Sequence, residues 1–291
     1  MGRSVLLTRS KPSGVFMPSN LAPPVIDERN VRLKRCRHGW MVYYQNDAYI
    51  GRSFDLYGEF ANFEVDAFEQ LIPKGGVAVD IGANIGAHTV PMARIVGDSG
   101  RVIAFEPQRV VHQLLCANVA LNALHNVWTF CAGSGREPGV MRVPPLDYNH
   151  AGNFGGISIS SGDVGEIVQI LPLDAVNLPA CHFIKIDVEG MECEVIAGAH
   201  NVIAKWRPLL YVENDRPEKS AQLVSDILAL DYRLYWHVTA LFNPANFFGT
   251  AENVFGRVSS FNMLCIPRER AFTVQGLREI TSPDESSPPV D

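Results

Sequence analysis

The sequence predicts an α/β protein built on one doubly wound, mostly parallel sheet. Two stretches carry this prediction: residues 77–86 (VAVDIGANIG) and residues 101–107 (RVIAFEP). The first combines a short apolar strand with a glycine turn and the start of a helix, and the second is an apolar strand that ends in Glu106. Along the rest of the chain, apolar strand-like runs alternate with segments of helical periodicity, which is typical of strand–helix–strand units.

The first 72 residues precede this core. Residues 1–20 mix Ser, Pro, Gly and Arg without periodicity, so we expect a flexible N-terminal arm. Residues 21–72 are expected to form a β-hairpin, with strands at 31–36 and 40–45, and then an amphipathic helix at 58–71 that carries phenylalanines at helical spacing. We expect the hairpin and this helix to pack on the core.

The core domain is predicted to span residues 73–270. Strands at 77–81, 102–105, 182–187 and 208–213 are each followed by a helix, at 87–96, 109–124, 191–204 and 217–230. Further strands are predicted at 127–131, 232–238 and 261–266. Residues 136–161 form a long glycine- and proline-rich stretch, and loops of this kind tend to be functional or mobile. Residues 271–291 are predicted as a flexible tail.

Composition narrows the function classes. With 291 residues and 47% apolar content the chain can bury one large core, and its net charge is −6. The run at 32–37 (RLKRCR) is more typical of an exposed strand face than of a basic binding surface, so we expect no nucleic-acid partner. The six cysteines include no Cys-x-x-Cys pair and indicate buried thiols in a reducing cytoplasm. No apolar stretch has membrane-spanning length, so we expect no membrane insertion.

The glycine turn differs from the one that binds dinucleotides. A Gly-x-Gly-x-x-Gly turn cradles a pyrophosphate, whereas here Asp80 precedes the turn and Asn84 lies inside it. Gly82 and Gly86 would let the backbone approach a ligand, and the acid favours a positive group, such as the amino group and sulfonium of S-adenosylmethionine. Glu106, at the carboxyl end of the next strand, is placed to accept two ribose hydroxyl protons. A tight turn without any ligand is the alternative interpretation.

A second polar group follows the strands at 182–187 and 208–213. Because side chains alternate along a strand, Lys185 and Asp187 lie on one side and are expected to pair. A paired Asp187 stays ionised and anchors a ligand, whereas a desolvated Asp187 becomes a plausible base. Glu189 and Glu213 lie at the same strand ends. An ion pair that only fixes the end of a strand is the alternative.

These motifs resemble those of the FkbM family of S-adenosylmethionine-dependent methyltransferases. The resemblance rests on the segments VDIGANIGAHT, GRVIAFEP, NVALNALHNV and KIDVEGMECEVIAGA, covers residues 58–213 and continues more loosely to 266. It implies a Rossmann-like class I methyltransferase fold, with a seven-stranded sheet whose last strand is antiparallel to the others. It also implies S-adenosylmethionine as cofactor and O-methylation of a hydroxyl on a sugar, glycan or natural-product acceptor.

The resemblance also implies roles for individual residues. Glu106 would hold the ribose, and Asp187 and Glu189 would lie where cofactor meets acceptor. Where many methyltransferases carry an acid near the adenine amino group, this chain has Ala132 and Ser134, so adenine recognition would fall to the backbone and Ser134. The pocket on the methionine side would be formed by Asp80, Gly82, Asn84 and Gly86.

A hydroxyl nucleophile needs a general base unless it is acidic. Asp187 and Glu189 are the first candidates, and His237, at the end of an aromatic-rich strand, is a further catalytic candidate. His88 could contact the cofactor or simply pack, and Glu59 could fold over the cofactor or cap the helix that follows it. A divalent cation at Asp187-x-Glu189 would be similar to the catechol-type methyltransferases, but hard oxygen sites usually use more carboxylates, so no metal ligand is assigned.

Two other functions remain open. The chain could methylate a nitrogen of a peptide or small molecule, or it could be a non-catalytic module that keeps the scaffold as an interaction surface. The Asn/Asp-Pro-Pro-aromatic motif of N-methylation is absent, since residues 214–217 read NDRP. The intact turn and strand-end acids favour an enzyme with a small-molecule or glycan acceptor. The sequence leaves the oligomeric state open, a homodimer included.

Overall fold

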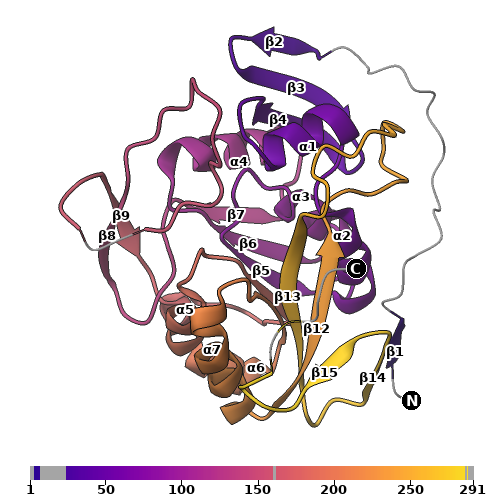
Figure 1. Ribbon diagram of the computed structural model, residues 1–291. Helices are drawn as coiled ribbons and strands as arrows, with labels where there is room; N and C mark the ends of the chain where they lie inside the picture. The colour runs from indigo at the N-terminus through magenta and orange to yellow at the C-terminus, as the bar shows by residue number, and fades with distance from the viewer. Residues whose placement is uncertain (1–2, 7–23, 160–161, 286, 288–291) are drawn as a thin grey trace.

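The computed structural model describes residues 3–6, 24–159, 162–285 and 287, and its centre is an eight-stranded mixed sheet (Figure 1). The strand order is β15-β12-β13-β11-β10-β5-β6-β7. The strands are β5 (Val77–Ile81), β6 (Arg101–Phe105), β7 (Val127–Phe130), β10 (Phe183–Ile186), β11 (Leu209–Glu213), β12 (Tyr232–Ala240), β13 (Ser259–Pro267) and β15 (Arg278–Ile280). The predicted α/β fold with one large sheet is confirmed.

The five strands from β11 to β7 run parallel, and β13 runs antiparallel to both β11 and β12. The antiparallel strand predicted at 261–266 is therefore β13. The predicted count of seven strands is wrong, because β15 pairs with β12 and adds an eighth strand at the edge. Ile280, which is 1% exposed, joins the apolar core and holds this short strand on the sheet.

Helices cover both faces of the sheet. They are α2 (Asn62–Leu71), α3 (Thr89–Val96), α4 (Arg109–Leu121), η1 (Leu173–Ala175), α5 (Glu192–Gly198), α6 (His200–Trp206) and α7 (Pro217–Ala229). One apolar layer lies between the sheet and α2 and α3, and another between the sheet and α5 to α7. In the described part of the chain, no helix combines the length and the apolar character needed to cross a membrane.

Alternation along β5 assigns its side chains to these two layers. Val79 and Ile81 belong to the layer of α5 to α7, whereas Ala78 belongs to the layer of α2 and α3. Asp80, two residues after Ala78, therefore faces α2 and α3. Phe183 and Tyr211 belong to the same layer, so every second residue after them on β10 and β11 points to this side as well.

The N-terminal part forms a three-stranded antiparallel sheet of β2 (Ile26–Glu28), β3 (Val31–Cys36) and β4 (Gly39–Tyr44). The predicted hairpin is confirmed as β3 and β4. The Asn118 side chain of α4 ties this sheet to the core, because it accepts from the backbone N–H of Val42 and donates to the carbonyl oxygens of Val42 and Ile85.

The helix predicted at 58–71 is shorter than expected. An additional helix, α1 (Ile50–Tyr57), ends at Gly58 in a left-handed conformation, and α2 begins only at Asn62. The helix predicted at 191–204 is likewise two helices, α5 and α6, which meet at Ala199.

Three segments that were predicted to be irregular contain strands. In the expected loop at 136–161, β8 (Gly139–Val143) pairs with β9 (Glu166–Ile170). In the predicted arm, β1 (Arg3–Leu6) pairs in parallel with β14 (Phe272–Gln275) of the predicted tail. None of the three segments is wholly irregular, because residues that are distant in the sequence pair and form strands where the local pattern carries no strand signal. Residues 1–2, 7–20, 286 and 288–291 of the arm and tail lie outside the described residues.

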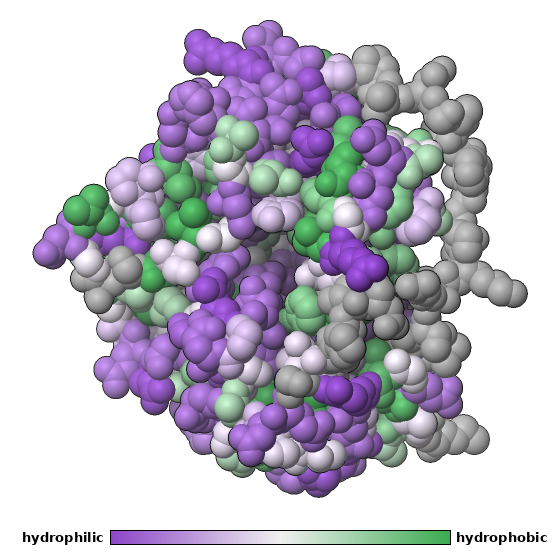
Figure 2. All heavy atoms as spheres, in the orientation of Figure 1, coloured by the Kyte–Doolittle hydropathy of each residue, from purple (hydrophilic) through white to green (hydrophobic). Residues whose placement is uncertain are grey.

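The chain changes direction across the sheet between β5 and β10. It starts at β5, moves outward to β6 and β7, and returns to β10 on the other side of β5. In open α/β sheets, ligands bind outside the carboxyl ends of the strands at such a switch point. Figure 2 shows that hydrophilic side chains cover most of the face seen in Figure 1, with apolar groups in smaller patches.

Candidate functional site

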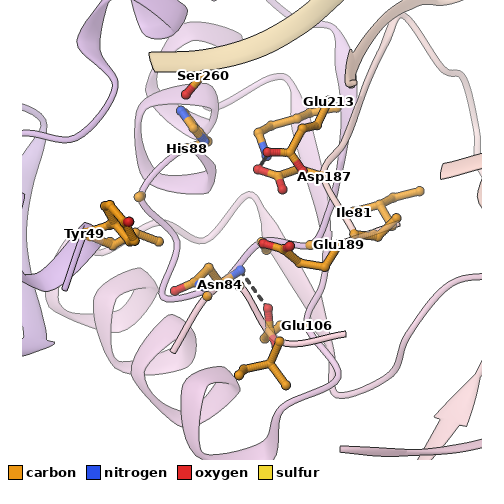
Figure 3. A pocket seen from close by; sticks show the side chains of 18 of the residues that line it. Tyr49, Ile81, Asn84, His88, Glu106, Asp187, Glu189, Glu213 and Ser260 are labelled. Atoms are coloured by element: carbon orange, nitrogen blue, oxygen red, sulfur yellow. Dashed lines mark hydrogen bonds and ion pairs between the residues drawn. The ribbon is translucent and has the colours of Figure 1, made fainter. Parts of the chain in front are cut away.

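A cavity of about 340 Å³ opens at this switch point, at the carboxyl ends of β5, β6, β10 and β11 (Figure 3). Its volume lies in the range of small-molecule sites. The predicted site residues that line it are Gly82, Asn84, Glu106, Ala132, Ser134, Asp187 and Glu189. The predicted site residues that are not among its lining residues are Glu59, Asp80, Gly86 and His237.

The turn after β5 is pressed against the residue that follows β10. Gly82 has a φ of +85°, and a Cβ atom there would lie 1.7 Å from the carbonyl oxygen of Asp187. A glycine is thus required at position 82 because two strand ends contact each other there. The sequence predicted a different reason, the approach of the backbone to a ligand. Gly86, with a φ of +88°, is also a packing residue, because a Cβ there would lie 2.8 Å from Leu115 Cδ1. Asn84, between the glycines, lines the cavity.

Glu106 forms part of the cavity wall and is 3% exposed. Its Oε2 accepts a hydrogen bond from the backbone N–H of Asn84, drawn in Figure 3, and its Oε1 accepts one from the N–H of Gln108, both at 2.8 Å. Burial raises the pKa of Glu106 to about 7, against the effect of these two bonds. Each oxygen can accept a further hydrogen bond, so this fixed carboxylate can bind a pair of neighbouring hydroxyl groups.

Ser134 lies on the same cavity, in the segment after β7. The residue is 3% exposed, and its Oγ has no hydrogen-bond partner among the described residues. Buried hydroxyl groups are nearly always hydrogen-bonded, so this atom fits a polar ligand atom inside the cavity. Ala132 lines the cavity beside it and leaves space for the ligand.

Asp80 lies beneath the cavity. It is 0% exposed, its Oδ2 accepts a hydrogen bond from Thr89 Oγ1 at 2.6 Å, and its Oδ1 lies 4.0 Å from Lys185 Nζ. The register explains the second contact, because Asp80 and Lys185 are direct partners across β5 and β10. Burial raises the pKa of Asp80. This placement makes Asp80 an anchor for the start of α3 and for Lys185, and it argues against the predicted place of Asp80 in the pocket wall.

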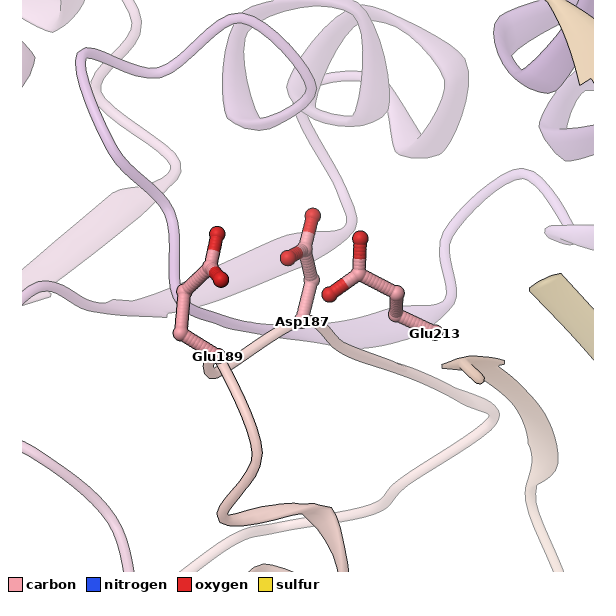
Figure 4. A group of neighbouring side chains, drawn as sticks. All are labelled: Asp187, Glu189 and Glu213. Carbon is pink, nitrogen blue, oxygen red and sulfur yellow. The ribbon is translucent and has the colours of Figure 1, made fainter. Parts of the chain in front are cut away.

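Three carboxylates meet at the ends of β10 and β11 (Figure 4). One oxygen each of Asp187, Glu189 and Glu213 lies within 4.8 Å of the other two. Lys185 Nζ donates to Asp187 Oδ2 at 2.9 Å, which confirms the pairing predicted from strand alternation, and Arg216 pairs with Glu189 at 2.7 Å. Two of the three carboxylates thus have cationic partners, which reduces the negative charge that could bind a divalent cation. We therefore assign no metal ligand.

The three carboxyl groups differ in their acidity. Burial opposes ionisation of Asp187, but the charge and hydrogen bond of Lys185 outweigh it and lower the Asp187 pKa. Burial and the neighbouring Asp187 charge raise the Glu213 pKa well above its usual value. Of the two hydrogen-bonded carboxyl groups, Glu213 is therefore the one that holds a proton more readily. Burial and the Asp187 charge also raise the Glu189 pKa, to about 7, against the effect of Arg216.

Glu64 of α2 is a cavity residue that was not predicted. It is 3% exposed, accepts a hydrogen bond from Asn262 Nδ2 at 3.2 Å, and lies 3.5 Å from His88 Nε2. Burial raises the Glu64 pKa to about 7, and burial together with the Lys185 charge lowers the His88 pKa well below its usual value, so His88 is neutral. The signal was present in the sequence, since Glu64 lies four residues from Phe68 and so shares the apolar face of its helix.

Glu59 is engaged away from the cavity. Its carboxylate pairs with Arg37 at 2.5 Å and accepts hydrogen bonds from Asn243 Nδ2 at 2.7 Å and from the N–H of Phe247 at 2.8 Å. It therefore connects the N-terminal hairpin to the loop after β12, and these partners explain why it does not fold over the cavity as predicted.

His237 is buried inside the protein. It is 6% exposed, its Nδ1 is hydrogen-bonded to the Tyr211 hydroxyl at 2.8 Å, and burial lowers its pKa to about 4. His237 lies on β12 and pairs with Asn262 of the neighbouring strand β13. In the sheet, β12 lies one strand further from β10 than β13 does, and Asn262 lines the cavity whereas His237 does not. The predicted catalytic contact is therefore not supported by its position.

The fold and the cavity define an α/β protein with a ligand site at a topological switch point. A family model described as the methyltransferase FkbM domain matches residues 80–235, more than half of the 291 residues. The chain belongs to the FkbM methyltransferase family, which confirms the resemblance drawn from its motifs.

Individual relatives are more distant. Methyltransferase sdnD of Sordaria araneosa is 26% identical over 47% of this chain and 69% of its own length. The 23S rRNA (uracil(1939)-C(5))-methyltransferase RlmD of Acinetobacter baylyi is 41% identical over 56 residues, which are 19% of this chain and 12% of that enzyme. The crystal structure of methyltransferase FkbM from Methylobacillus flagellatus is 16% identical, with a TM-score of 0.42 over 75% of this chain and 55% of that chain. The chain thus spans about half of that structure and a small part of RlmD.

Proposed function

We propose that this protein transfers a methyl group from S-adenosylmethionine to a hydroxyl group of a sugar, glycan or natural product. Membership of the FkbM family supports methyl transfer. The observation that carries the cofactor assignment is Glu106, whose two oxygens are fixed by backbone N–H groups at the cavity wall. An acid at the end of the second strand of such a unit is the group that binds ribose hydroxyls.

Residues from several strand ends would hold the cofactor. Glu106 accepts the ribose hydroxyls, and Ser134, whose hydroxyl lacks a partner among the described residues, binds the adenine side together with the backbone at Ala132. The turn from Gly82 to Asn84 borders the methionine side. When bound, S-adenosylmethionine supplies a methyl group activated by a sulfonium.

The rest of the cavity suits an uncharged, polyhydroxylated acceptor. Glu64, Ser260 and Asn262 offer hydrogen-bonding groups, and Leu241 offers apolar surface. Among the described residues that line the cavity, Lys185 is the only lysine or arginine, and it is already paired with a carboxylate. An anionic acceptor would therefore meet repulsion from several carboxylates, and a hydroxylated neutral one would not.

Asp187 and Glu189 are the proposed catalytic groups. Lys185 keeps Asp187 ionised as the group that accepts the hydroxyl proton, and Glu189, which pairs with Arg216 at 2.7 Å, lies beside it as a further hydrogen-bond acceptor for the hydroxyl. Both line the cavity, and in Figure 3 they lie between Glu106 and His88. Holding the hydroxyl in line with the methyl–sulfur bond would contribute much of the rate.

Calorimetric titration with S-adenosylmethionine tests the cofactor assignment. We expect binding in the micromolar range, and a loss of about 10–100-fold in Glu106→Gln, because charge-assisted hydrogen bonds contribute about 1.5–3 kcal/mol. Glu137→Gln changes an exposed acid and should bind like the wild type. Folded wild-type protein that does not bind S-adenosylmethionine would contradict the proposal.

Transfer of a labelled methyl group to paired acceptors tests the reaction. Each pair contains one sugar or polyol and its amino analogue, and NMR identifies the atom that carries the methyl carbon. We expect the label on oxygen. Label on nitrogen would replace the proposal by N-methylation, the alternative drawn from the sequence.

A further inference from the structure

Unpartnered polar atoms surround the acidic end of the cavity. Oε2 of Glu213 is buried and receives no hydrogen bond from an N–H or hydroxyl group within the described part of the chain, and the group that faces Glu213 is a second carboxylate, Asp187. Nε2 of His88, a residue that is 6% exposed, lies on the same cavity and also has no hydrogen-bond partner there. Buried polar atoms are normally satisfied, so two such atoms on one cavity indicate that polar or charged ligand groups come to this end of it.

We propose that Asp187 and Glu213 form a charge-matching pair for the sulfonium of S-adenosylmethionine. The two carboxylates share one proton in the free protein, release it when the positively charged cofactor binds, and take up the hydroxyl proton of the acceptor as the methyl group is transferred. This inference rests on the proposed function and deepens it, because it assigns a role to Glu213 and links the proton to the cofactor charge.

The geometry around the pair sets its charge. Lys185 is 2% exposed and donates to Asp187 at 2.9 Å, so one positive charge is fixed beside the pair. With one shared proton, Asp187 and Glu213 carry a single negative charge, which Lys185 balances. Lys185 is buried and Asp187 is 34% exposed, and a second negative charge at this partly buried pair is costly, so the shared proton leaves when another positive charge arrives and covers the pair. The raised pKa of Glu213, caused by burial and by Asp187, agrees with this arrangement.

The other groups that face the pair do not supply that positive charge. Glu189 and Arg216 pair with each other at 2.7 Å, and burial keeps His88 neutral. The charged and titratable neighbours from the surrounding elements are Glu64 on α2, His88 before α3, Asp80 on β5, Glu106 after β6, Lys185 on β10, Glu189 after β10, Glu192 on α5, Tyr211 on β11, and Asp215 and Arg216 after β11.

The proton and charge balance closes over the reaction. Methyl transfer breaks the bond between sulfur and the methyl carbon and forms a bond between that carbon and the hydroxyl oxygen. The bonding electron pair stays on sulfur, which becomes neutral, and the hydroxyl oxygen gives up its proton. Asp187 and Glu213 accept this proton, so their negative charge falls at the moment when the positive charge on sulfur disappears. The demethylated product then has no charge that holds it at the pair.

Three ligands that differ at one position test the inference. S-adenosylmethionine has a sulfonium, sinefungin has an ammonium group in its place, and S-adenosylhomocysteine has a neutral thioether. Calorimetry at pH 7 in two buffers of different ionisation enthalpy gives both the affinity and the number of protons released. We expect the two cationic ligands to bind about tenfold more tightly than S-adenosylhomocysteine and to release about one proton more.

Variants locate the effect. Glu213→Gln keeps the shape of the side chain but has no proton to release, so both differences should disappear while the affinity for S-adenosylhomocysteine stays within about twofold. Asp187→Asn should have the same effect. Glu218→Gln is the matched control, because it removes an exposed acid in the first turn of α7, outside the cavity lining, and it should keep both differences.

The outcomes separate this inference from the proposed function. If wild-type protein binds all three ligands equally and releases equal numbers of protons, the pair has no such role, although the cofactor site is real. If both differences persist in Glu213→Gln and Asp187→Asn, other groups carry the effect and the inference is wrong. If folded wild-type protein binds none of the three ligands, the proposed function itself fails. If one of the two variants does not fold, the number of protons released by the wild type and the behaviour of the other variant still test the inference.

Discussion

A single methyl group at Gly82 should disrupt both the fold and the site. In Gly82→Ala, the new Cβ atom would lie 1.7 Å from the carbonyl oxygen of Asp187, so the two strand ends must separate by roughly an ångström or more. The residue would also adopt a φ of +85°, which disfavours any side chain. The comparison is Gly256→Ala, where φ is +59° and no atom lies within 4 Å of the added Cβ.

Both variants lose stability because alanine must adopt a left-handed backbone conformation, but only Gly82→Ala also loses stability through a steric clash. A left-handed backbone costs a non-glycine residue about 1 kcal/mol, and both variants lose this. Overpacking between rigid backbone segments adds about 1–3 kcal/mol, and only Gly82→Ala suffers it. We therefore expect a loss in the free energy of unfolding of about 1 kcal/mol for Gly256→Ala and about 2–4 kcal/mol for Gly82→Ala. The effect of alanine on the unfolded chain is common to both and cancels in the comparison.

Urea denaturation measures these losses, and calorimetry measures the affinity for S-adenosylmethionine. Displacement of Asp187 and of the turn should weaken cofactor binding at least about tenfold in Gly82→Ala, because a shift of this size disturbs a preorganised site. Gly256→Ala should bind like the wild type. Equal losses of stability in the two variants would refute the contact between strand ends as the reason for this glycine.

Three further predictions concern single polar groups. Ser134→Ala should change the free energy of unfolding by less than about 0.5 kcal/mol, because the Ser134 hydroxyl has no partner among the described residues. The same variant should weaken S-adenosylmethionine binding about 3–10-fold. Urea denaturation measures the first effect and calorimetry the second, and an unchanged affinity would contradict the adenine-side role of Ser134. Burial raises the Glu64 pKa from 4.5 to about 7, so the stability tied to its protonated form is present below pH 4.5 and is lost as the pH rises through 7. Between about pH 5 and about pH 8, the free energy of unfolding should therefore fall less in Glu64→Gln than in the wild type, and the two decreases should differ by on the order of 1–3 kcal/mol. Parallel curves of stability against pH for the two proteins would show that Glu64 does not titrate in this range. Asn118→Ala removes every side-chain bond to the Val42 backbone and should cost about 2–4 kcal/mol in urea denaturation, with the exposed Gln222→Ala as a control that stays near the wild type.

Local rules were sufficient for several site residues. The placement of Lys185 and Asp187 on one side of a strand follows from alternation alone, and the two form an ion pair at 2.9 Å. Glu106 was recognisable because an acid at the end of a strand next to a glycine turn lies within one supersecondary unit. Ser134 could be named from its place after the third strand, but the lack of a partner for its hydroxyl became visible only in the structure.

Other predictions depended on distant contacts, and the structure places their residues away from the cavity lining or adds residues that they missed. His237 was expected near the acceptor, yet the pairing of β12 with β13 places it beside Tyr211 and away from the cavity lining. Glu59 was expected over the cofactor, but Arg37 of the N-terminal hairpin binds its carboxylate. Glu64 was overlooked, because an acid on an apolar helix face gains meaning only when the facing sheet is known to be polar at that point.

The sequence by itself determined the class of protein. Strand and helix periodicity, the glycine turn and the acids at the strand ends are short-range patterns, and together they specify the α/β fold and the FkbM family. Only the tertiary structure decided the strand pairings of β1, β14 and β15, the exclusion of Asp80 from the cavity lining, and the meeting of Asp187 and Glu213 within 4.8 Å. The physical reason is that strand pairing, desolvation and ion pairing depend on neighbours that lie far apart in the chain, so no local pattern carries them.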